Sequence, residues 1–301
     1  MSCPICGWVF SGERVLVKHL PRFFRCPRCS GYYHQEGGKP PYHEGYFSER
    51  GSVSLGQRVL SVFLWLRAQK IKRILADSGA RILDYGSGDG RLVSYLNSRG
   101  FHADGYDPSE AAVSLARKNN IPVYGSIPDK QYDLIMFWHS LEHSDTPLND
   151  IVACKKYCAP SAKLLIAVPN ADSLEAKISG KTWFCYDWPF HRVHFTLWTL
   201  KVLLEKAGFH IVSVDYINPE YTLSSLAQTF LNLFLPKNVF YGLMTARRSD
   251  RSRGAMLAWG LISLAALVIF SPFLFLAFAA ELAAKKTAAF VVVAEKDSCY
   301  I

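Results

Sequence analysis

The residues with the clearest chemical potential in this chain are an aspartate and three glycines near position 85. Asp84 is followed by Gly86, Gly88 and Gly90, and an apolar run leads into them. Glycine accepts positive φ angles and lets a ligand approach the backbone closely, while the N–H groups of a helix that starts here could hold polar ligand atoms. The pattern predicts a ligand-binding turn between a strand and a helix. A tight turn without a ligand is the alternative.

A second acid, Asp107, follows the next predicted strand. An acid at the tip of that strand can accept hydrogen bonds from both hydroxyls of a ribose. The alternative is an N-cap for the helix that begins near Ser109. A nicotinamide-dependent enzyme would use the same acid, but its fingerprint is Gly-x-Gly-x-x-Gly, whereas this chain has Gly-x-Gly-x-Gly.

Two groups of histidines could perform acid–base chemistry. His139, Glu142 and His143 are spaced so that they would share one face of a helix, and imidazole titrates near neutral pH. The alternative is that Glu142 and His143 only cap and brace the turn. His191 and His194 lie in an aromatic segment, residues 183–196. We expect His191 either in an acceptor site or in the packing, and His194 in the packing of a loop that excludes water.

Four cysteines near the N-terminus have the spacing of a metal site. Cys3 and Cys6 form one Cys-x-x-Cys pair, and Cys26 and Cys29 form the second. Two such pairs at this separation are typical of a zinc ribbon, in which the metal supplies most of the folding energy. Disulfides are the alternative, and the polar N-terminus, which resembles no signal peptide, disfavours them.

The elements that must position these residues alternate between strands and helices. Short apolar runs predict one strand that ends at Ile82 and Leu83, and further strands at residues 101–105, 131–137, 163–168, 209–214 and 290–295, with amphipathic helices between most of them. Such alternation is typical of an α/β fold. We expect a zinc ribbon at 1–36, a linker at 37–52, and an α/β domain formed by 53–218 and 288–301. Residues 219–287 are expected to form an apolar helical insertion before the last strand.

The motifs, taken in order, resemble those of class I S-adenosylmethionine-dependent methyltransferases. The branch with the ubiquinone-biosynthesis O-methyltransferases is the most similar. The resemblance rests on the glycine turn, Asp107, Leu141-Glu142-His143, the strand closed by Pro169-Asn170, and the Trp…Pro-x-His…His-Phe-Thr pattern of the aromatic segment. It covers roughly residues 45–215 and the terminal strand, and it implies a Rossmann-like, seven-stranded methyltransferase sheet.

The resemblance also implies roles for individual residues, with S-adenosylmethionine as cofactor. The glycine turn would pack against the methionine part, Asp84 would hold its ammonium group, and Asp107 would accept the ribose hydroxyls. Ser126 and Ile127 would flank the adenine, although many relatives carry an acid there. The candidates for chemistry on the methyl acceptor are His139, His143 and His191. In some relatives an acidic version of the first group binds a divalent metal, and here His139 replaces its first acid.

The insertion contains a long uncharged stretch. Met256–Ala280 is 25 residues without a charge, which is long enough to cross a bilayer. The terminal strand must pair beside the sixth, however, so both ends of the stretch must lie on one side of a membrane. Basic residues flank it at Arg247–Arg253 and Lys285-Lys286, which favours the cytoplasmic face.

Pro272 would break a helix near the middle of this stretch. We therefore expect a re-entrant hairpin, Met256–Ser271 and Phe273–Ala280, with the amphipathic run Leu223–Leu235 lying in the membrane interface. An even number of crossings is one alternative. A helical hairpin buried in the interface of a homodimer is another.

The formal net charge of +9 suits anionic lipid headgroups as a partner. The sequence thus predicts a methyltransferase on the cytoplasmic face of a prokaryotic membrane. The expected acceptor is lipid-linked or a small molecule of an envelope pathway: a polyprenyl-linked glycan, a nucleotide sugar or a quinone-like lipid, methylated on oxygen. Two alternatives are an RNA methyltransferase with a zinc ribbon and a non-catalytic membrane-tethered scaffold. We expect no nucleic-acid partner, because much of the positive charge flanks the apolar insertion.

Overall fold

The computed structural model describes residues 2–9, 15–16, 22–34, 54–75, 79–187, 189–244 and 253–297. The predicted linker, residues 37–52, and the arginines from 247 to 251 lie outside the described residues. The positions of the candidate site residues are all described.

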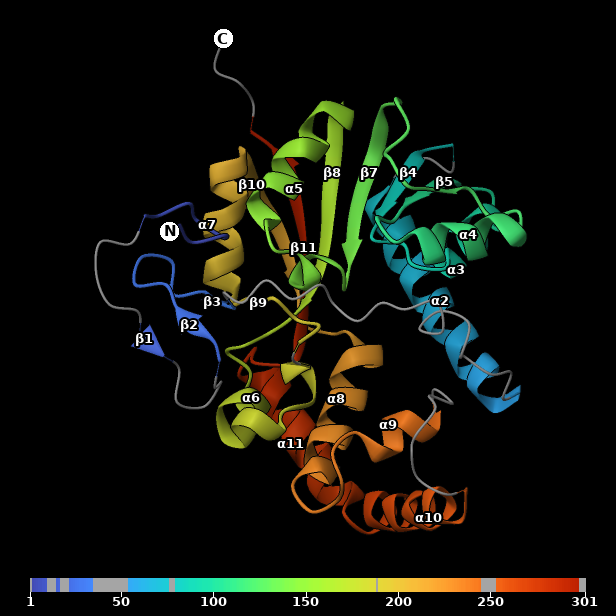
Figure 1. The fold of residues 1–301 in the computed structure, drawn as a ribbon, viewed down its shortest axis with the longest axis vertical. Helices are drawn as coiled ribbons and strands as arrows, with labels where there is room; N and C mark the ends of the chain where they lie inside the picture. The colour runs from blue at the N-terminus through green and yellow to red at the C-terminus, as the bar shows by residue number, and fades with distance from the viewer. Residues whose placement is uncertain are drawn as a thin grey trace.

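A seven-stranded sheet with the order β10-β11-β8-β7-β4-β5-β6 forms the centre of the molecule (Figure 1). The last strand in the chain, β11, lies inside the sheet and runs antiparallel to both of its neighbours. The other pairings, from β8 to β6, are parallel. This arrangement confirms the predicted Rossmann-like methyltransferase sheet. The strands are β4 (Arg81–Tyr85), β5 (His102–Tyr106), β6 (Val123–Tyr124), β7 (Tyr132–Trp138), β8 (Cys158–Pro169), β10 (Phe209–Asp215) and β11 (Ala289–Lys296).

Helices cover both faces of the sheet because its central strands are apolar on both sides. On β8, Leu164 and Ile166 pack with α5 (Pro147–Cys154) and α7 (Leu197–Ala207). Leu165 and Ala167 point the other way, toward α2 (Ser54–Ile74) and α3 (Arg91–Asn97). Successive side chains of a strand alternate between its faces, so a continuous apolar strand requires this double cover. Helix α4 (Glu110–Lys118) packs beside β6.

The cysteine-bearing N-terminal residues form a second, small sheet with the order β1-β2-β3-β9. Strands β1 (Val15–Leu16), β2 (Phe24–Arg25) and β3 (Tyr32–Tyr33) come from the ribbon, whereas β9 (Val193–His194) belongs to the aromatic segment. The ribbon is therefore hydrogen-bonded to a segment that is far away in the sequence.

The insertion contains α8 (Pro219–Asn232), α9 (Val239–Met244), α10 (Arg253–Ile269) and α11 (Ser271–Ala283). It leaves the sheet at the end of β10 and returns at the start of β11. Since β10 and β8 are both antiparallel to β11, this is the edge at which β4, β5 and β7 also end. In α/β folds, ligands bind at that edge. Figure 1 shows the insertion below it.

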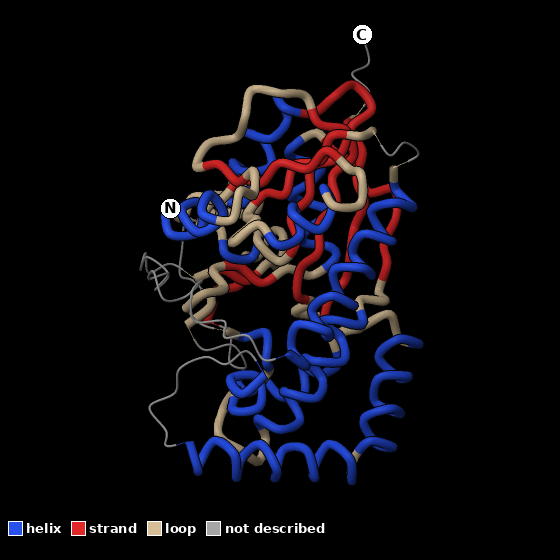
Figure 2. The backbone as a smooth tube through the Cα atoms, turned by 90° about the vertical axis from the view of Figure 1, so that its right-hand side faces the viewer, coloured by secondary structure: helices blue, strands red, loops and turns tan. Residues whose placement is uncertain are grey.

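Helices α10 and α11 meet at an elbow rather than folding back as the predicted hairpin. Within the described part of the chain, no individual helix has both the length and the apolar character to cross a membrane. The pair Leu257–Ile269 and Ser271–Ala283 meets those criteria together, by length and composition, with a bend of 67° (Figure 2). Pro272 lies in the first turn of α11, where a missing N–H costs no helical hydrogen bond, so it starts a second helix. We call α10 and α11 the apolar elbow.

Candidate active site

The glycine turn between β4 and α3 has the backbone geometry that its sequence predicts. Gly86, Gly88 and Gly90 have φ angles of 79°, 57° and 76°, a region that other residues enter with strain. A Cβ on Gly86 would lie 2.4 Å from the Cβ of Ser140. Gly86 N also donates a 2.7 Å hydrogen bond to Tyr106 O, so the turn is tied to β5. The turn can approach a ligand without intervening side chains.

Two buried acids flank this turn. Asp84 is only 4% exposed, and burial raises its pKa to about 7, with nearby Arg67 opposing the shift and Asp107 adding to it. The carboxylate of Asp107 accepts hydrogen bonds from Gly88 N at 2.8 Å and Ser109 N at 2.9 Å, and burial also raises its pKa. A buried carboxyl group of this kind gains most from a cationic partner. The pair therefore fits the ammonium and ribose of S-adenosylmethionine, the first residue by charge and the second by its lone pairs.

The predicted adenine contacts follow β6. Ser126 is exposed and lines a surface hollow of about 550 Å³ with residues of α4 and β6, including Arg117. Ile127 instead packs against the core on the α5–α7 side of the sheet. Since the glycine turn does not line this hollow, the adenine role of both residues stays a prediction.

His139, one of the candidates for chemistry on the methyl acceptor, has a strained backbone. It follows β7 directly and has a φ angle of +52°, which is uncommon for a residue other than glycine and is found disproportionately at functional sites. Its N–H donates to Ala167 O at 3.0 Å. The imidazole is 5% exposed, and burial, assisted by the charge of Arg67, holds its pKa well below the usual range. His139 is therefore a neutral imidazole at physiological pH.

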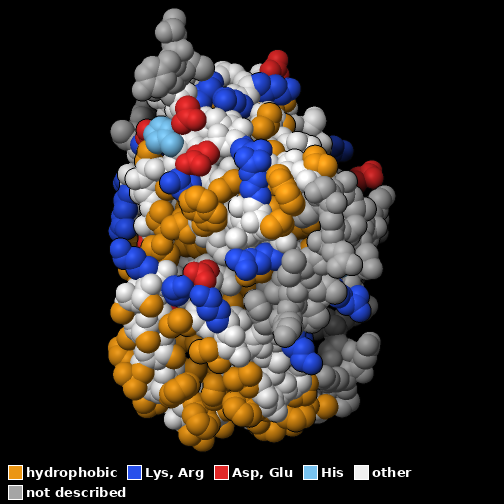
Figure 3. Space-filling model, turned by 90° about the vertical axis from the view of Figure 1, so that its left-hand side faces the viewer, with side chains coloured by type: hydrophobic (Ala, Val, Ile, Leu, Met, Phe, Trp, Pro, Cys, Tyr) orange, Lys and Arg blue, Asp and Glu red, His pale blue; other side chains and the backbone are white. Residues whose placement is uncertain are grey.

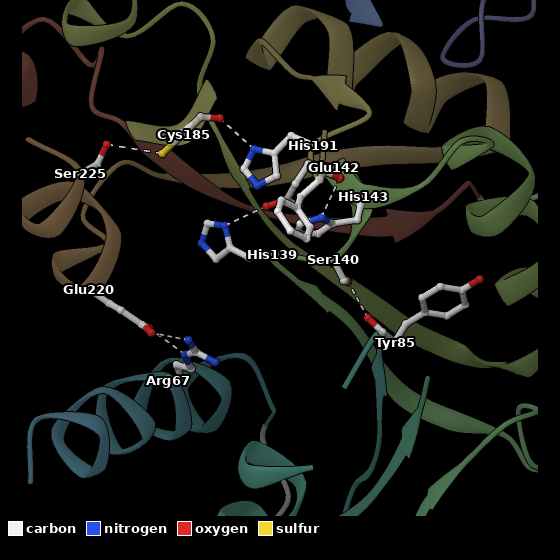
Figure 4. A network of polar contacts seen from close by, with 11 residues as sticks. Arg67, Tyr85, His139, Ser140, Glu142, His143, Cys185, His191, Glu220 and Ser225 are labelled. Carbon is white, nitrogen blue, oxygen red and sulfur yellow. Dashed lines mark hydrogen bonds and ion pairs between the residues drawn. The ribbon is translucent and has the colours of Figure 1, made fainter. Parts of the chain in front are cut away.

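Two neighbours fix the ring of His139. Its Nδ1 lies 3.2 Å from Glu142 Oε1 (Figure 4), and the ring of Tyr221 on α8 stacks on it with 3.3 Å between centroids and 16° between planes. The other ring nitrogen, Nε2, is buried and has no hydrogen-bond partner among the described residues. The neutral imidazole thus offers one oriented, unbonded nitrogen that can accept a hydrogen bond from the hydroxyl of a bound acceptor.

Glu142, His143 and His191 form a second cluster beside this ring. The short 3₁₀ helix η1 (Leu141–His143) carries the first two residues. Because His139 lies before this helix, the predicted helix face shared by His139, Glu142 and His143 does not form. His143 Nδ1 lies 3.0 Å from Phe190 O, and His191 Nδ1 lies 2.8 Å from Cys185 O. Burial lowers the pKa of these histidines to about 3 and about 4. Both are neutral, with the Nδ1 hydrogen pointing at a carbonyl.

This cluster has the ligand types of a metal site. One ligand atom from each of Glu142, His143 and His191 lies within 4.8 Å of the others. Histidines that bind metals usually donate their second ring hydrogen to a carbonyl or carboxylate, as these two do. Burial raises the pKa of Glu142 to about 8, a penalty that a divalent cation would offset. The three residues could therefore hold such a cation.

His194 touches this cluster only through a ring contact, with 5.8 Å between its ring centroid and that of His191. Among the described residues, neither of its ring nitrogens has a hydrogen-bond partner, and its ring packs against Phe23, Trp183 and Tyr186. The contacts of His194 are thus apolar and aromatic, which agrees with the packing role predicted for it.

The four N-terminal cysteines converge, as their spacing predicts. All four are buried, and one sulfur atom from each lies within 4.8 Å of the others. The Sγ atoms of Cys3 and Cys29 are 3.8 Å apart, and those of Cys6 and Cys26 are 3.7 Å apart. Sulfur atoms around a tetrahedral zinc ion with Zn–S bonds of about 2.3 Å would lie about 3.8 Å apart. The donor set fits zinc.

Sequence reasoning missed the contribution of α2 and α8 to the site. Arg67 on α2 forms a two-pronged ion pair with Glu220 on α8, one arm being 2.8 Å from Nε to Oε2, and its guanidinium lies 5.0 Å from the ring of Trp138. Tyr221, the next residue, covers His139. Helical periodicity marks which residues of these helices face inward, but it gives no signal that two segments so distant in the chain meet.

A family model described as a methyltransferase domain matches residues 64–214. This range contains the glycine turn, both acids and the four histidines. It excludes the ribbon, the insertion and β11.

Two curated relatives are ubiquinone biosynthesis O-methyltransferases. The one from Hahella chejuensis is 30% identical over 118 residues, which cover 35% of this chain and 50% of that protein. The one from Marinobacter nauticus is 29% identical over 120 residues, with the same coverage of 35% and 50%. The chain spans about half the length of the curated relatives it matches.

A solved structure from Galdieria sulphuraria, described as a sarcosine dimethylglycine methyltransferase, shares the fold. It superposes with a TM-score of 0.51 at 17% identity and covers 79% of this chain and 86% of that one. At this identity the likeness concerns the fold alone.

Proposed function

We propose an acceptor at the surface of a lipid bilayer for this chain, which belongs to the methyltransferase-domain family and is an S-adenosylmethionine-dependent methyltransferase. The acceptor is lipid-linked or belongs to an envelope pathway: a polyprenyl-linked glycan, a nucleotide sugar or a quinone-like lipid, methylated on oxygen. The observation that carries the proposal is that the insertion leaves and rejoins the sheet at the edge where the candidate acceptor residues lie.

The apolar elbow supports a membrane partner because it exposes large apolar side chains. Residues 254–280 carry no charge, and the next residue, Glu281, is 2% exposed. Monomeric soluble proteins rarely expose a contiguous apolar area of this kind. Figure 3 shows hydrophobic side chains gathered over the lower end of the molecule. The exposed large apolar side chains of the elbow are Leu257, Leu261, Ile262, Leu264, Val268, Ile269, Phe270, Phe273, Phe275 and Leu276.

Helix α8 supports the same partner because its polar side faces inward. Ser225 and Thr229 are at most 4% exposed. Ser225 Oγ donates to Glu175 Oε1, and Thr229 Oγ1 accepts from Phe184 N at 2.9 Å. Leu223, in contrast, is 52% exposed. A helix that buries polar groups and exposes leucine is suited to an apolar surrounding, in agreement with the predicted interfacial position of 223–235.

Basic residues border the apolar elbow. Lys285 and Lys286 follow α11 directly, and Figure 3 shows Lys and Arg side chains above the hydrophobic end. Each such cation near an anionic bilayer contributes about 1 kcal/mol of attraction. We propose that this end lies on the cytoplasmic face of a prokaryotic membrane, without crossing it, with anionic lipid as the partner of the +9 net charge.

The chemistry follows from the two sides of the site. S-adenosylmethionine supplies an electrophilic methyl group on a positively charged sulfur atom. Asp84 and Asp107 would hold it against the glycine turn. As the bond from sulfur to the methyl group broke and the bond from the acceptor oxygen to that group formed, the acceptor hydroxyl would release its proton to His139 Nε2, while Glu142 and Tyr221 keep the ring in place. The aromatic segment and α8 exclude water from this side. Alignment and proton removal are the main tasks for such a transfer.

Zinc in the ribbon is part of the proposal. The four buried thiol groups fit a tetrahedral ion by type and spacing. In this role the metal is structural, because four protein ligands leave no open position for a substrate. It would supply the folding energy of a module too small to have its own core.

The experiment uses the full chain and membranes of the source cells with methyl-labelled S-adenosylmethionine. Label is counted in lipid, soluble-metabolite and RNA fractions, and the protein is located after lysis without detergent. The proposal expects label in the lipid or metabolite fraction and protein in the membrane pellet. Label in RNA alone would overturn the acceptor class. Protein that stays entirely in the supernatant would overturn the membrane partner and favour a second copy of the chain as the cover of the elbow.

A further inference from the structure

The ribbon is built into the wall of the acceptor side. Strand β3 pairs with β9 in the register Tyr32 to His194 and Tyr33 to Val193. His34 N continues this pairing with a 2.9 Å hydrogen bond to Arg192 O. The next hydrogen bond on the same segment runs from Arg192 N to Glu142 O at 2.7 Å. A continuous path of backbone hydrogen bonds therefore connects the ribbon to the Glu142 that holds His139.

Phe23 adds a side-chain contact to this path. It precedes β2, is fully buried, and packs with Trp183, Cys185 and Tyr186 of the aromatic segment. Its ring centroid is 4.6 Å from that of His194 and 5.7 Å from that of Tyr186. Phe23 thus belongs to the ribbon by sequence and to the core under the aromatic segment by packing.

The cysteine end of the ribbon is attached to the helix that follows the aromatic segment. Thr199 Oγ1 on α7 donates to Cys29 O at 3.3 Å. A Cβ on Gly31 would lie 2.4 Å from Ile5 Cδ1 and 2.6 Å from Thr199 Cγ2. The cysteines share one apolar core with Leu200 and Leu203 of α7. Both the end of the aromatic segment and the helix after it are therefore held by the ribbon.

We propose that Phe23 is a positioning residue for the acceptor site, and that the metal-loaded ribbon acts through it and through the β3–β9 pairing to hold His191 and Glu142 in place. The inference rests on the proposed function for its kinetic part only. A ribbon that merely sat on the surface would have no buried aromatic residue under the acceptor segment and no strand paired with it. The cofactor end of the site, residues 81–107, is held by other contacts, so we expect no change there when Phe23 is substituted or the ribbon loses its metal.

The test compares Phe23→Ala with Val9→Ala, a ribbon residue that is 66% exposed. Amide hydrogen exchange of the zinc-loaded full chain is followed at residues 192–195 and, as an internal reference, at 83–85 of β4. Loss of a buried phenylalanine should open the local structure, so Phe23→Ala should exchange at least about tenfold faster at 192–195 and unchanged at 83–85. Val9→Ala should match the wild type at both. Zinc content and the Kd of S-adenosylhomocysteine are measured on the same samples.

Kinetics supply a second readout. Methyl transfer into a total-lipid extract of the source cells should show a half-saturating lipid concentration raised about fivefold or more, with kcat changed less than about threefold. Phe23→Leu keeps most of the apolar volume, so its hydrogen exchange at 192–195 and its half-saturating lipid concentration should both lie closer to the wild-type values than to those of Phe23→Ala. If Phe23→Ala loses zinc, Phe23→Leu decides, and the part of the effect that leucine does not recover must still raise exchange at 192–195 above that of Val9→Ala.

Equal exchange at 192–195 in Phe23→Ala and the wild type, or equal acceleration at 83–85, would overturn the inference. Removing zinc with a chelator should likewise raise exchange at 192–195 before 83–85. If no lipid is methylated, the proposed function fails, but the exchange and cofactor-binding results still decide the role of Phe23.

Discussion

The two ends of this active site are built in different ways. The cofactor end comes from one continuous stretch, β4 to β6, in which the glycine turn, Asp84 and Asp107 lie within a single strand–helix–strand unit. The acceptor end combines the ribbon, α2, the loop after β7, the aromatic segment and α8. The residues of the first are therefore neighbours in the sequence, whereas the second brings together distant parts of the chain. The two ends touch where Gly86 packs on Ser140, but a change at one end should have its main effect at that end.

The largest expected effect concerns His139. His139→Asn removes the imidazole but keeps a side chain that tolerates the left-handed backbone, which alanine would strain. We expect kcat to fall by about 10²- to 10⁴-fold, with the Kd of S-adenosylhomocysteine unchanged. Methyl transfer and calorimetric titration measure the two. His210→Asn, with a side chain that is 52% exposed, is the control. Wild-type turnover in His139→Asn would assign proton removal to another group.

The second prediction changes the cofactor end of the site, at Gly86. A Cβ here would overlap Ser140, so Gly86→Ala should weaken cofactor binding at least about a hundredfold by displacing the turn. Zinc content and hydrogen exchange at 192–195 should stay the same. Gly242→Ala on α9 is the control, since a Cβ there meets nothing within 4 Å. Gly86→Ala combined with Ser140→Gly should recover part of the affinity. Loss of exchange protection at 192–195 would contradict the separation of the two ends.

The acceptor end should also depend on the membrane. Leu261→Lys with Phe275→Lys places two charges on the elbow, at side chains that are both 70% exposed. The partition of the protein onto vesicles of anionic phospholipid should fall at least about thirtyfold, because lysine is costly in an apolar layer. Cofactor affinity should not change. Val9→Lys on the ribbon is the matched control. Unchanged flotation of the double variant would exclude the elbow as the contact surface.

A smaller effect comes from the pH dependence of cofactor binding. The pKa of Asp84 is raised to about 7 by burial, so the carboxylate that would pair with the ammonium group is lost as the pH falls below that value. The Kd should be constant above about pH 8 and rise up to about tenfold per unit below pH 7. Titrations from pH 5.5 to 8.5 test this. Asp84→Asn should bind weakly at all of these pH values, with most of the dependence removed.

The smallest effect is on stability. Burial raises the pKa of Glu175 to about 8, with the charge of Glu281 adding to it, whereas in the unfolded chain it is about 4.3. A carboxyl group whose pKa is higher in the folded protein than in the unfolded chain contributes stability at pH values below its pKa in the unfolded chain. This contribution is lost as the pH rises to its pKa in the folded protein. Glu175→Gln should therefore gain about 1–2 kcal/mol relative to the wild type between pH 6 and pH 8. Urea unfolding measures this. If the free energy of unfolding changes equally with pH in both proteins, the carboxyl group of Glu175 is already ionised in the folded protein over this range.

The same division explains how much could be predicted. The strand–turn–helix pattern around Gly86 and the spacing of the cysteines are local, and the structure has both. The contacts between Tyr221 and His139, between Arg67 and Glu220, and between Phe23 and His194 join residues that no periodicity relates. The bend of the elbow was also missed, because Pro272 indicates a break but not its angle. Helix α8 shows a further limit, because an amphipathic pattern does not reveal which face is turned to the protein.

The place of β11 inside the sheet has a consequence for how the protein is made. This strand, Ala289–Lys296, fills the gap between β8 and β10 and comes after the elbow, Arg253–Ala283, in the chain. During synthesis the elbow leaves the ribosome first, while β8 and β10 still have open edges that are prone to wrong pairing. The sheet can therefore close only after the elbow has been synthesised, because β11 supplies the pairing that joins β8 to β10. Under the membrane function that we propose, the segment that would bind lipid is thus made before the catalytic sheet is complete.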